Sequence, residues 1–141
     1  MDVSNDSLIE DDESVIVTLT GITSGDGDIS IDPANDDATV TIADNDSASV
    51  SIAATDATAG EPADNGVFRV TISHQSDTDT TIDYTVSGTA TQGTDYQALG
   101  VLTIPANTSS TDVTVTVLDN APVEDDETVT VTLTGITSGD G

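Results

Sequence analysis

Residues 123–141 read VEDDETVTVTLTGITSGDG, and residues 9–27 read IEDDESVIVTLTGITSGDG. The two stretches agree at 16 of 19 positions, and position 123 follows position 9 by 114 residues. Self-similarity at a fixed spacing is the signature of tandem repeats, and a spacing of this size suits one small domain. The sequence therefore predicts tandem modules with a 114-residue repeat.

Short stretches of alternating apolar and polar residues run along the chain, and turn residues separate them. A period of two is typical of strands with one buried face. No segment shows a helical period. We therefore predict an all-β fold, an immunoglobulin-like antiparallel β-sandwich. The apolar positions of the expected strands are Val15/Val17/Leu19, Val40/Ile42, Val50/Ile52, Phe68/Val70/Ile72, Ile82/Tyr84/Val86, Leu102/Ile104, Val113/Val115/Val117 and Val129/Val131/Leu133.

An acidic triplet, Asp44-Asn45-Asp46, separates two of these expected strands. We place the junction between modules here, because polar segments of this kind commonly separate neighbouring domains. Residues 1–46 are then the C-terminal part of one repeat, and residues 47–141 are the N-terminal part of the next. The second part lacks its last strand, which residues 38–43 represent in the first part.

The chain carries 27 acidic residues against a single basic residue, Arg69, for a formal net charge of −26. Nucleic acids and anionic membranes need Lys and Arg to neutralise phosphate, so both are excluded as partners. Crowded carboxylates repel one another unless cations bind them or salt screens them. With no cysteine for a disulfide, bound metal is the cross-link that this composition favours.

The composition also argues against an enzyme and against a membrane span. His74 is the only histidine and no cysteine accompanies it, so the usual transition-metal sites and nucleophile–base pairs cannot be assembled. No apolar run reaches the roughly 20 residues of a membrane helix, so no membrane insertion is expected in this segment. We expect a binding or structural module.

Residues 88–135, GTATQGTDYQALGVLTIPANTSSTDVTVTVLDNAPVEDDETVTVTLTG, resemble the Calx-β domain, as does ATVTIADND at 38–46. The GTA-x-x-G-x-DY step, the later acidic loop, the DE-x-V-x-V strand and the terminal acidic triplet follow the family's order. Members of this family occur in sodium–calcium exchangers, in integrin β4 and in bacterial surface proteins. The resemblance implies an immunoglobulin-like sandwich that holds Ca²⁺ at one end.

The resemblance also implies a set of calcium ligands in loops at that end. Asn120, Ala121 and Asn45 stand where the exchanger pattern carries aspartates, which implies a smaller site for one or two ions. Independently, Ca²⁺ prefers six to eight oxygen ligands, and loops rich in Asp, Asn and Glu supply them. The implied ligands are Asp95, Asp119, Glu124 and Glu127 in the second module, and Asp44 and Asp46 in the terminal triplet of the first.

Near-identical repeats are typical of a scaffold. We therefore expect a calcium-binding structural or adhesive repeat module of a secreted or cell-surface bacterial protein. One alternative is a calcium-sensing regulatory module, which would need divergent repeats. Another is a carbohydrate- or ice-binding module that uses the outward threonines Thr114, Thr116, Thr130 and Thr132.

Neighbouring copies of the same repeat are the expected partners. Residues 44–47 alone join residues 39–43 to the next module, and four extended residues reach at most about 14 Å. A strand spans about 20 Å, so the segment cannot cross its own chain's sandwich to fill the last position. We expect another molecule to donate this strand, which would give a filament or a swapped dimer.

Overall fold

The computed structural model describes residues 2–120 and 123–139, which form eight strands and no helix. All paired strands are antiparallel, so the predicted all-β fold class is confirmed. No described helix is long and apolar enough to cross a membrane. The chain divides into two compact units, one formed by residues 2–5 and 11–45 and the other by residues 6–10 and 46–139.

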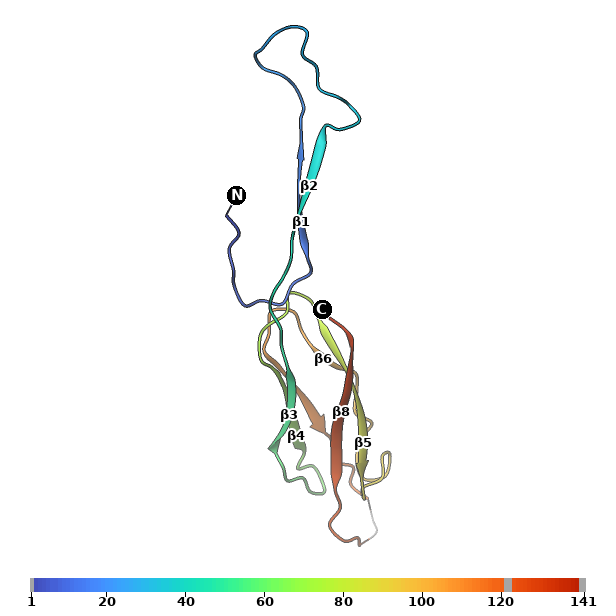
Figure 1. Cartoon of the computed structure of the whole chain (residues 1–141). Helices are drawn as coiled ribbons and strands as arrows, with labels where there is room; N and C mark the ends of the chain where they lie inside the picture. Colours follow the sequence, from blue (N-terminus) through green and yellow to red (C-terminus); the bar gives the residue numbers. More distant parts are fainter. Residues whose placement is uncertain (1, 121–122, 140–141) are drawn as a thin grey trace. The chain divides into compact units, whose positions relative to one another are not determined.

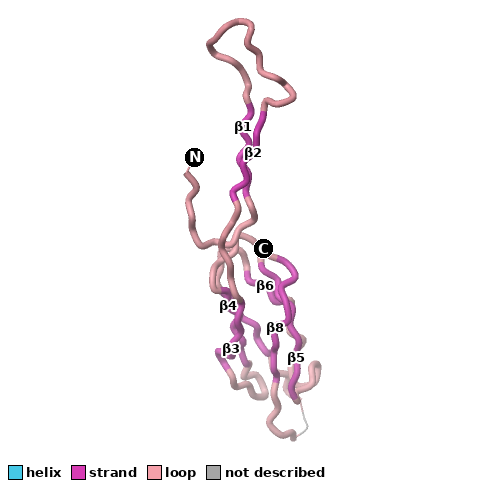
Figure 2. The backbone as a smooth tube through the Cα atoms, in the orientation of Figure 1, coloured by secondary structure: helices cyan, strands magenta, loops and turns pink. Residues whose placement is uncertain are grey.

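The first unit is a two-stranded ribbon. Strand β1 (Glu13–Thr18) pairs with β2 (Asp37–Ile42), as Figure 2 shows. In the ladder Val15 lies opposite Val40. The β-branched residues threonine, valine and isoleucine in both strands favour this extended pairing. Two strands form no second layer of their own, and Val40 is 55% exposed as a result. Of residues 38–43, expected as a strand, residues 38–42 thus pair with β1.

The second unit is a sandwich of two three-stranded sheets (Figure 1). One sheet has the order β3-β4-β7, from strands β3 (Val50–Asp56), β4 (Gly66–Ile72) and β7 (Ser110–Val115). The other has the order β6-β5-β8, from strands β5 (Thr80–Gly88), β6 (Leu102–Ile104) and β8 (Val129–Ser138). Every strand lies where the alternating pattern predicts one.

Apolar side chains from both sheets meet in the core of this sandwich. Val70 and Ile72 of β4 pack with Ile82 of β5 and with Leu102 and Ile104 of β6, and all five are buried. The residues between them along these strands are exposed or half-buried, as the alternation of a strand requires. Burial of these side chains supplies the main stabilisation of the unit. It also fixes the strand ends from which the loops emerge.

A close approach between β5 and β8 orders the loop that follows β5. Gly88 has a φ of 131°, and a Cβ built on it would overlap the carbonyl oxygen of Thr128. That same oxygen accepts hydrogen bonds from the backbone N–H groups of Thr89 (3.0 Å) and Ala90 (3.1 Å). Only glycine fits this position, so Gly88, the first residue of the GTA motif, has a structural role.

Residues 6–10 belong to the second unit. Ile9 is buried, and its N–H donates to the carbonyl of Gln75 at 2.9 Å, while the N–H of Asp77 donates to the carbonyl of Ile9 at 3.1 Å. This pair of hydrogen bonds forms a short parallel bridge beside Ser76. The start of the first copy of the repeated motif is therefore anchored on the loop between β4 and β5.

Candidate metal centre

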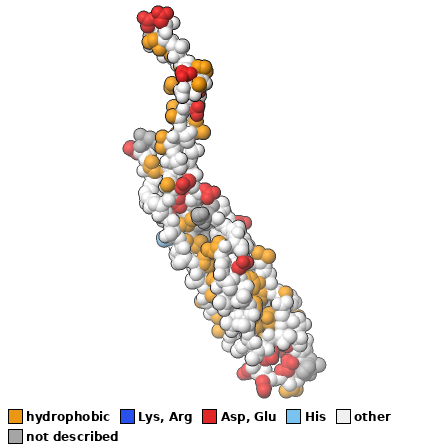
Figure 3. Space-filling model, turned by 45° about the vertical axis from the view of Figure 1, so that its right-hand side comes forward, with side chains coloured by type: hydrophobic (Ala, Val, Ile, Leu, Met, Phe, Trp, Pro, Cys, Tyr) orange, Lys and Arg blue, Asp and Glu red, His pale blue; other side chains and the backbone are white. Residues whose placement is uncertain are grey.

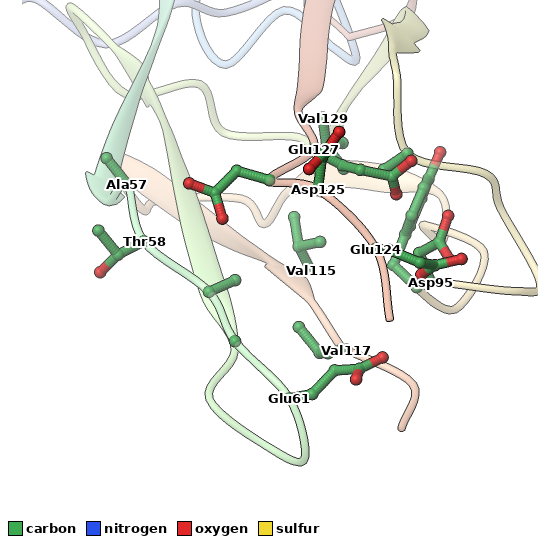
Figure 4. A pocket seen from close by; sticks show the side chains of 15 residues that line it. Ala57, Thr58, Glu61, Asp95, Val115, Val117, Glu124, Asp125, Glu127 and Val129 are labelled. Carbon is green, nitrogen blue, oxygen red and sulfur yellow. The ribbon is translucent and has the colours of Figure 1, made fainter. Parts of the chain in front are cut away.

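Acidic side chains gather at one end of the second unit, at the bottom of Figure 3. Three connecting segments meet there, namely those between β3 and β4, between β5 and β6, and between β7 and β8. They line an open hollow of about 520 Å³ (Figure 4). Loops presented by a rigid sandwich are the usual place for a binding site.

Asp95 is held by a tight turn over residues 91–96. Its N–H donates to the carbonyl of Thr91 at 2.9 Å, and its Oδ2 accepts from the N–H of Thr91 at 2.6 Å. Gly93, with a φ of 87°, allows the chain to reverse between them. The carbonyl of Asp95 accepts from the N–H of Leu118 at 2.9 Å, which fixes the turn against the segment that follows β7. The carboxylate is therefore prepositioned.

Glu124 and Glu127 approach Asp95 from the segment before β8. One carboxylate oxygen from each of the three residues lies within 4.8 Å of the other two. Figure 4 shows the side chains of Glu124 and Asp95 close together. Asp95 is half-buried, whereas the two glutamates are exposed. Three converging carboxylates without a cation repel one another.

The electrostatic consequence appears at Glu127. Partial removal from water, a hydrogen bond to Asp95 and the negative charges of Asp95 and Glu124 together raise the pKa of Glu127 above its usual value. Each of these influences penalises the charged form of this carboxyl group. A bound cation would relieve the repulsion.

Asn120 adds an uncharged oxygen beside the three carboxylates. Its Nδ2 donates to Oε2 of Glu124 at 3.1 Å and, at 3.4 Å, to Oδ1 of Asp95. Its Oδ1 is buried and has no hydrogen-bond partner among the described residues. Leaving a buried amide oxygen unpaired costs about 1–3 kcal/mol, so buried amide oxygens usually have a hydrogen-bond donor or a cation beside them.

Glu61 joins the centre from the segment between β3 and β4. Its Oε1 accepts from the backbone N–H of Asn120 at 3.2 Å, which couples this segment to the one after β7. Its carboxylate lines the same hollow as the three clustered acids (Figure 4). All three loops thus contribute an oxygen-bearing side chain to one end of the sandwich.

The six sequence-predicted ligands have different positions in the structure. Asp95, Glu124 and Glu127 come together. Asp119 is exposed and lies outside this group. Its neighbour Asn120 is half-buried, and the side chain of Asn120 contacts Glu124 and Asp95. Asp44 belongs to the first unit and Asp46 to the second, and both are half-buried.

Two residues of the centre were not among the predicted ligands. Asn120 was interpreted as a lost aspartate, although its amide oxygen is itself a suitable ligand for Ca²⁺. Glu61 lies in the segment AGEPADNG, far in sequence from the acidic loop. A nearby turn signal, Asp64-Asn65-Gly66, marks a loop but does not indicate which end of the sandwich that loop occupies.

The chemistry of this donor set fits a hard cation such as Ca²⁺ better than zinc. All the donors are carboxylate or amide oxygens, whereas structural zinc is usually held by cysteine and histidine. The four side chains Asp95, Asn120, Glu124 and Glu127 would hold the ion, and a cation would pair with the Oδ1 of Asn120, for which the described part of the chain offers no hydrogen-bond donor.

Comparison with protein families gives two matches to the Calx-beta domain, over residues 1–46 and over residues 44–140. Together the matches span nearly the whole chain. Neither the curated proteins nor the solved structures gave a match.

Proposed function

We propose, from the premise that this chain belongs to the Calx-beta domain family, that its acidic cluster binds Ca²⁺ and that its role is structural. Calx-beta domains are β-sandwich modules associated with calcium binding, in a family of structural and regulatory domains. The observation that carries the proposal is the buried Oδ1 of Asn120, which has no hydrogen-bond partner among the described residues and lies beside the carboxylates of Asp95, Glu124 and Glu127.

Calcium would act here as a cross-link between loops. Asp95 comes from the loop between β5 and β6, and Asn120, Glu124 and Glu127 come from the segment between β7 and β8. An ion shared by these residues would neutralise their repulsion and restrict both segments. The sandwich end would become stiffer, which suits a chain with no disulfide.

The anchored segment at residues 6–10 supports a role in a tandem array. By the 114-residue spacing, Asp6 and Glu10 correspond to Asn120 and Glu124 of the candidate site. Ile9, between them, is hydrogen-bonded to the loop that joins β4 and β5. We infer that the calcium loop of one repeat adjoins the β4–β5 loop of the next, so that calcium stiffens module junctions.

The parent protein is proposed to be a secreted or cell-surface bacterial protein with an adhesive or spacer role. Extracellular calcium and salt would offset the net charge of −26. Neighbouring repeats are the proposed partners. The near-identity of residues 9–27 and 123–141 favours a scaffold over the calcium-sensing alternative, which would need modules of different affinity.

The structure does not favour the carbohydrate- or ice-binding alternative. Thr114 lies on β7 and Thr116 follows it, whereas Thr130 and Thr132 lie on β8 of the opposite sheet. The four threonines therefore form no single flat face.

Thermal unfolding tests the proposal. Calcium at 100 times its dissociation constant should stabilise the chain by about 2.7 kcal/mol, which shifts the midpoint by several degrees. Sodium at matched ionic strength should shift it less. If chelation at constant ionic strength leaves the melting curve unchanged, the calcium claim is wrong.

A further inference from the structure

The segment after β7, residues 116–120, is held by hydrogen bonds on two sides. On one side, the carbonyl of Thr116 accepts from the N–H of Gln97 at 2.9 Å. The N–H of Leu118 donates to the carbonyl of Asp95 at 2.9 Å. These two bonds attach the segment to the turn that presents Asp95. On the other side lies the loop between β3 and β4.

The backbone of this loop does not continue the ladder between β4 and β7. The ladder reaches Gly66 opposite Val115, so the same register two residues further on would pair Asp64 with Val117. The carbonyl of Asp64 instead accepts from the N–H of Gly60 at 2.8 Å, and the N–H of Asp64 donates to the carbonyl of Gly60 at 2.8 Å. The backbone of Asp64 thus closes a small turn.

The side chain of Asn65 supplies the acceptor that the ladder lacks at this point. The N–H of Val117 donates to Oδ1 of Asn65 at 2.9 Å, and both residues are half-buried. Short polar side chains such as asparagine readily take the place of a backbone partner. An amide oxygen also does so without adding a negative charge near a centre that already gathers three carboxylates.

The same loop holds the far end of the segment. Oε1 of Glu61 accepts from the N–H of Asn120 at 3.2 Å. Glu61 lies within the turn that the backbone bonds between Gly60 and Asp64 close, and Asn65 follows that turn directly. One compact loop therefore fixes the segment at two points, which sets the direction in which the side chain of Asn120 leaves the backbone.

We propose that Asn65 is a positioning residue of the metal centre. Its hydrogen bond to Val117 holds the course of residues 116–120, so that the side chain of Asn120 reaches the clustered carboxylates. Asn65 is not one of the described residues that line the hollow, so it acts through Asn120 and not on an ion. The consequence for calcium affinity rests on the proposed function.

Nuclear magnetic resonance in chelator tests the positioning without calcium. Asn65→Leu removes the acceptor and keeps a side chain of similar size, so hydrogen exchange at the N–H of Val117 should be at least tenfold faster and the side-chain amide resonances of Asn120 should shift. Ala63→Leu, at an exposed position of the same loop, is the matched control and should change neither. An Asn120 amide that is unchanged in Asn65→Leu, or that shifts equally in Ala63→Leu, would overturn the proposal.

Asn65→Asp is the conservative variant, because a carboxylate also accepts from the N–H of Val117. It should restore slow exchange at Val117. Its added charge attracts cations, so the rescue is measured in chelator. Exchange as fast as in Asn65→Leu would contradict the role of Oδ1 as the acceptor. If Asn65→Leu does not fold, Asn65→Ala removes the same acceptor and takes its place.

Calorimetric titration of Ca²⁺, well below the unfolding midpoint, tests the consequence for the metal centre. Asn65→Leu should raise the Kd at least tenfold, whereas Ala63→Leu should leave it within twofold of the wild-type value. A bond that only stabilises the fold would lower the unfolding midpoint equally in chelator and in calcium and leave this Kd unchanged, which would overturn the proposal. A wild-type chain that binds no calcium would contradict the proposed function, and the exchange measurement then decides on the positioning of Asn120.

Discussion

The amide of Asn120 donates a hydrogen bond of 3.1 Å to Oε2 of Glu124, while its own Oδ1 stays buried with no partner in the described chain. The donor half of the amide is thus used by a carboxylate, and the acceptor half is left for a cation. This arrangement distinguishes the cluster from the many solvated acids of the chain.

Asn120→Asp should have opposite effects with and without calcium. Without calcium, a fourth carboxylate increases the repulsion and lowers the melting temperature. With calcium, the added charge strengthens ion binding, so the affinity should rise about tenfold, or by about 1.4 kcal/mol. Melting curves in chelator and in calcium check both signs.

Thr85→Asp is the matched control for this substitution, because it adds one negative charge on the exposed face of β5. It should lower the melting temperature slightly in both conditions. An Asn120→Asp variant that behaves in the same way as Thr85→Asp would mean diffuse screening and no site.

Glu127→Gln should stabilise the calcium-free chain and weaken calcium binding. The substitution removes a charge from a group that Asp95 and Glu124 repel, and it removes a carboxylate ligand. The midpoint in chelator should rise while the calcium-dependent increment shrinks. A variant that is destabilised in chelator would show that the carboxylate of Glu127 has a different structural partner.

Gly88→Ala should destabilise the second unit by about 2 kcal/mol or more, because the new Cβ meets the carbonyl of Thr128 at a positive φ. Denaturant unfolding measures this cost. Gly100→Ala is the control, since a Cβ there meets no atom within 4 Å. Equal losses for the two variants would argue against the close approach of β5 and β8.

The ion pair between Arg69 of β4 and Asp112 of β7 predicts that the stability of the second unit depends on pH. Hydrogen bonds from Arg69 to Asp112, at 2.7 and 2.8 Å, lower the pKa of Asp112. A lowered folded-state pKa contributes stability above the unfolded value, near pH 4, and that stability is lost as the pH falls through the folded value.

The stability difference between wild type and Asp112→Asn should therefore be constant above about pH 5 and should shrink below about pH 4. Urea unfolding across this range measures it. Asp83→Asn, at an exposed position of β5, is the control. A difference that grows as the pH falls would have the wrong sign for this ion pair.

Strand positions could be predicted from the sequence because inward side chains must alternate with outward ones. Val70 and Ile72 on β4, for example, stand two apart and are both buried. The same rule does not predict that Val17 and Val40 are exposed. Their burial depends on a second layer, which the first unit does not contain.

Within the candidate site, Asp95, Glu124 and Glu127 could be predicted from the sequence because their loops contain motifs that resemble those of the Calx-β domain. Asn120 was not predicted as a ligand, because asparagine stands where the family pattern carries an aspartate, and the substitution was read as the loss of a ligand. Glu61 was not, because its role depends on a hydrogen bond to the N–H of Asn120, across a long separation in the chain. Side-chain direction at Asp119 and Asn120 needed the folded backbone.

Calorimetric titration of Ca²⁺ into the wild-type chain, Asp95→Asn and Asp83→Asn tests the central claim most directly. The account predicts saturable binding to the wild type and to Asp83→Asn, with affinity reduced at least tenfold in Asp95→Asn. Binding that is absent in the wild type, or equally strong in Asp95→Asn and Asp83→Asn, would contradict it.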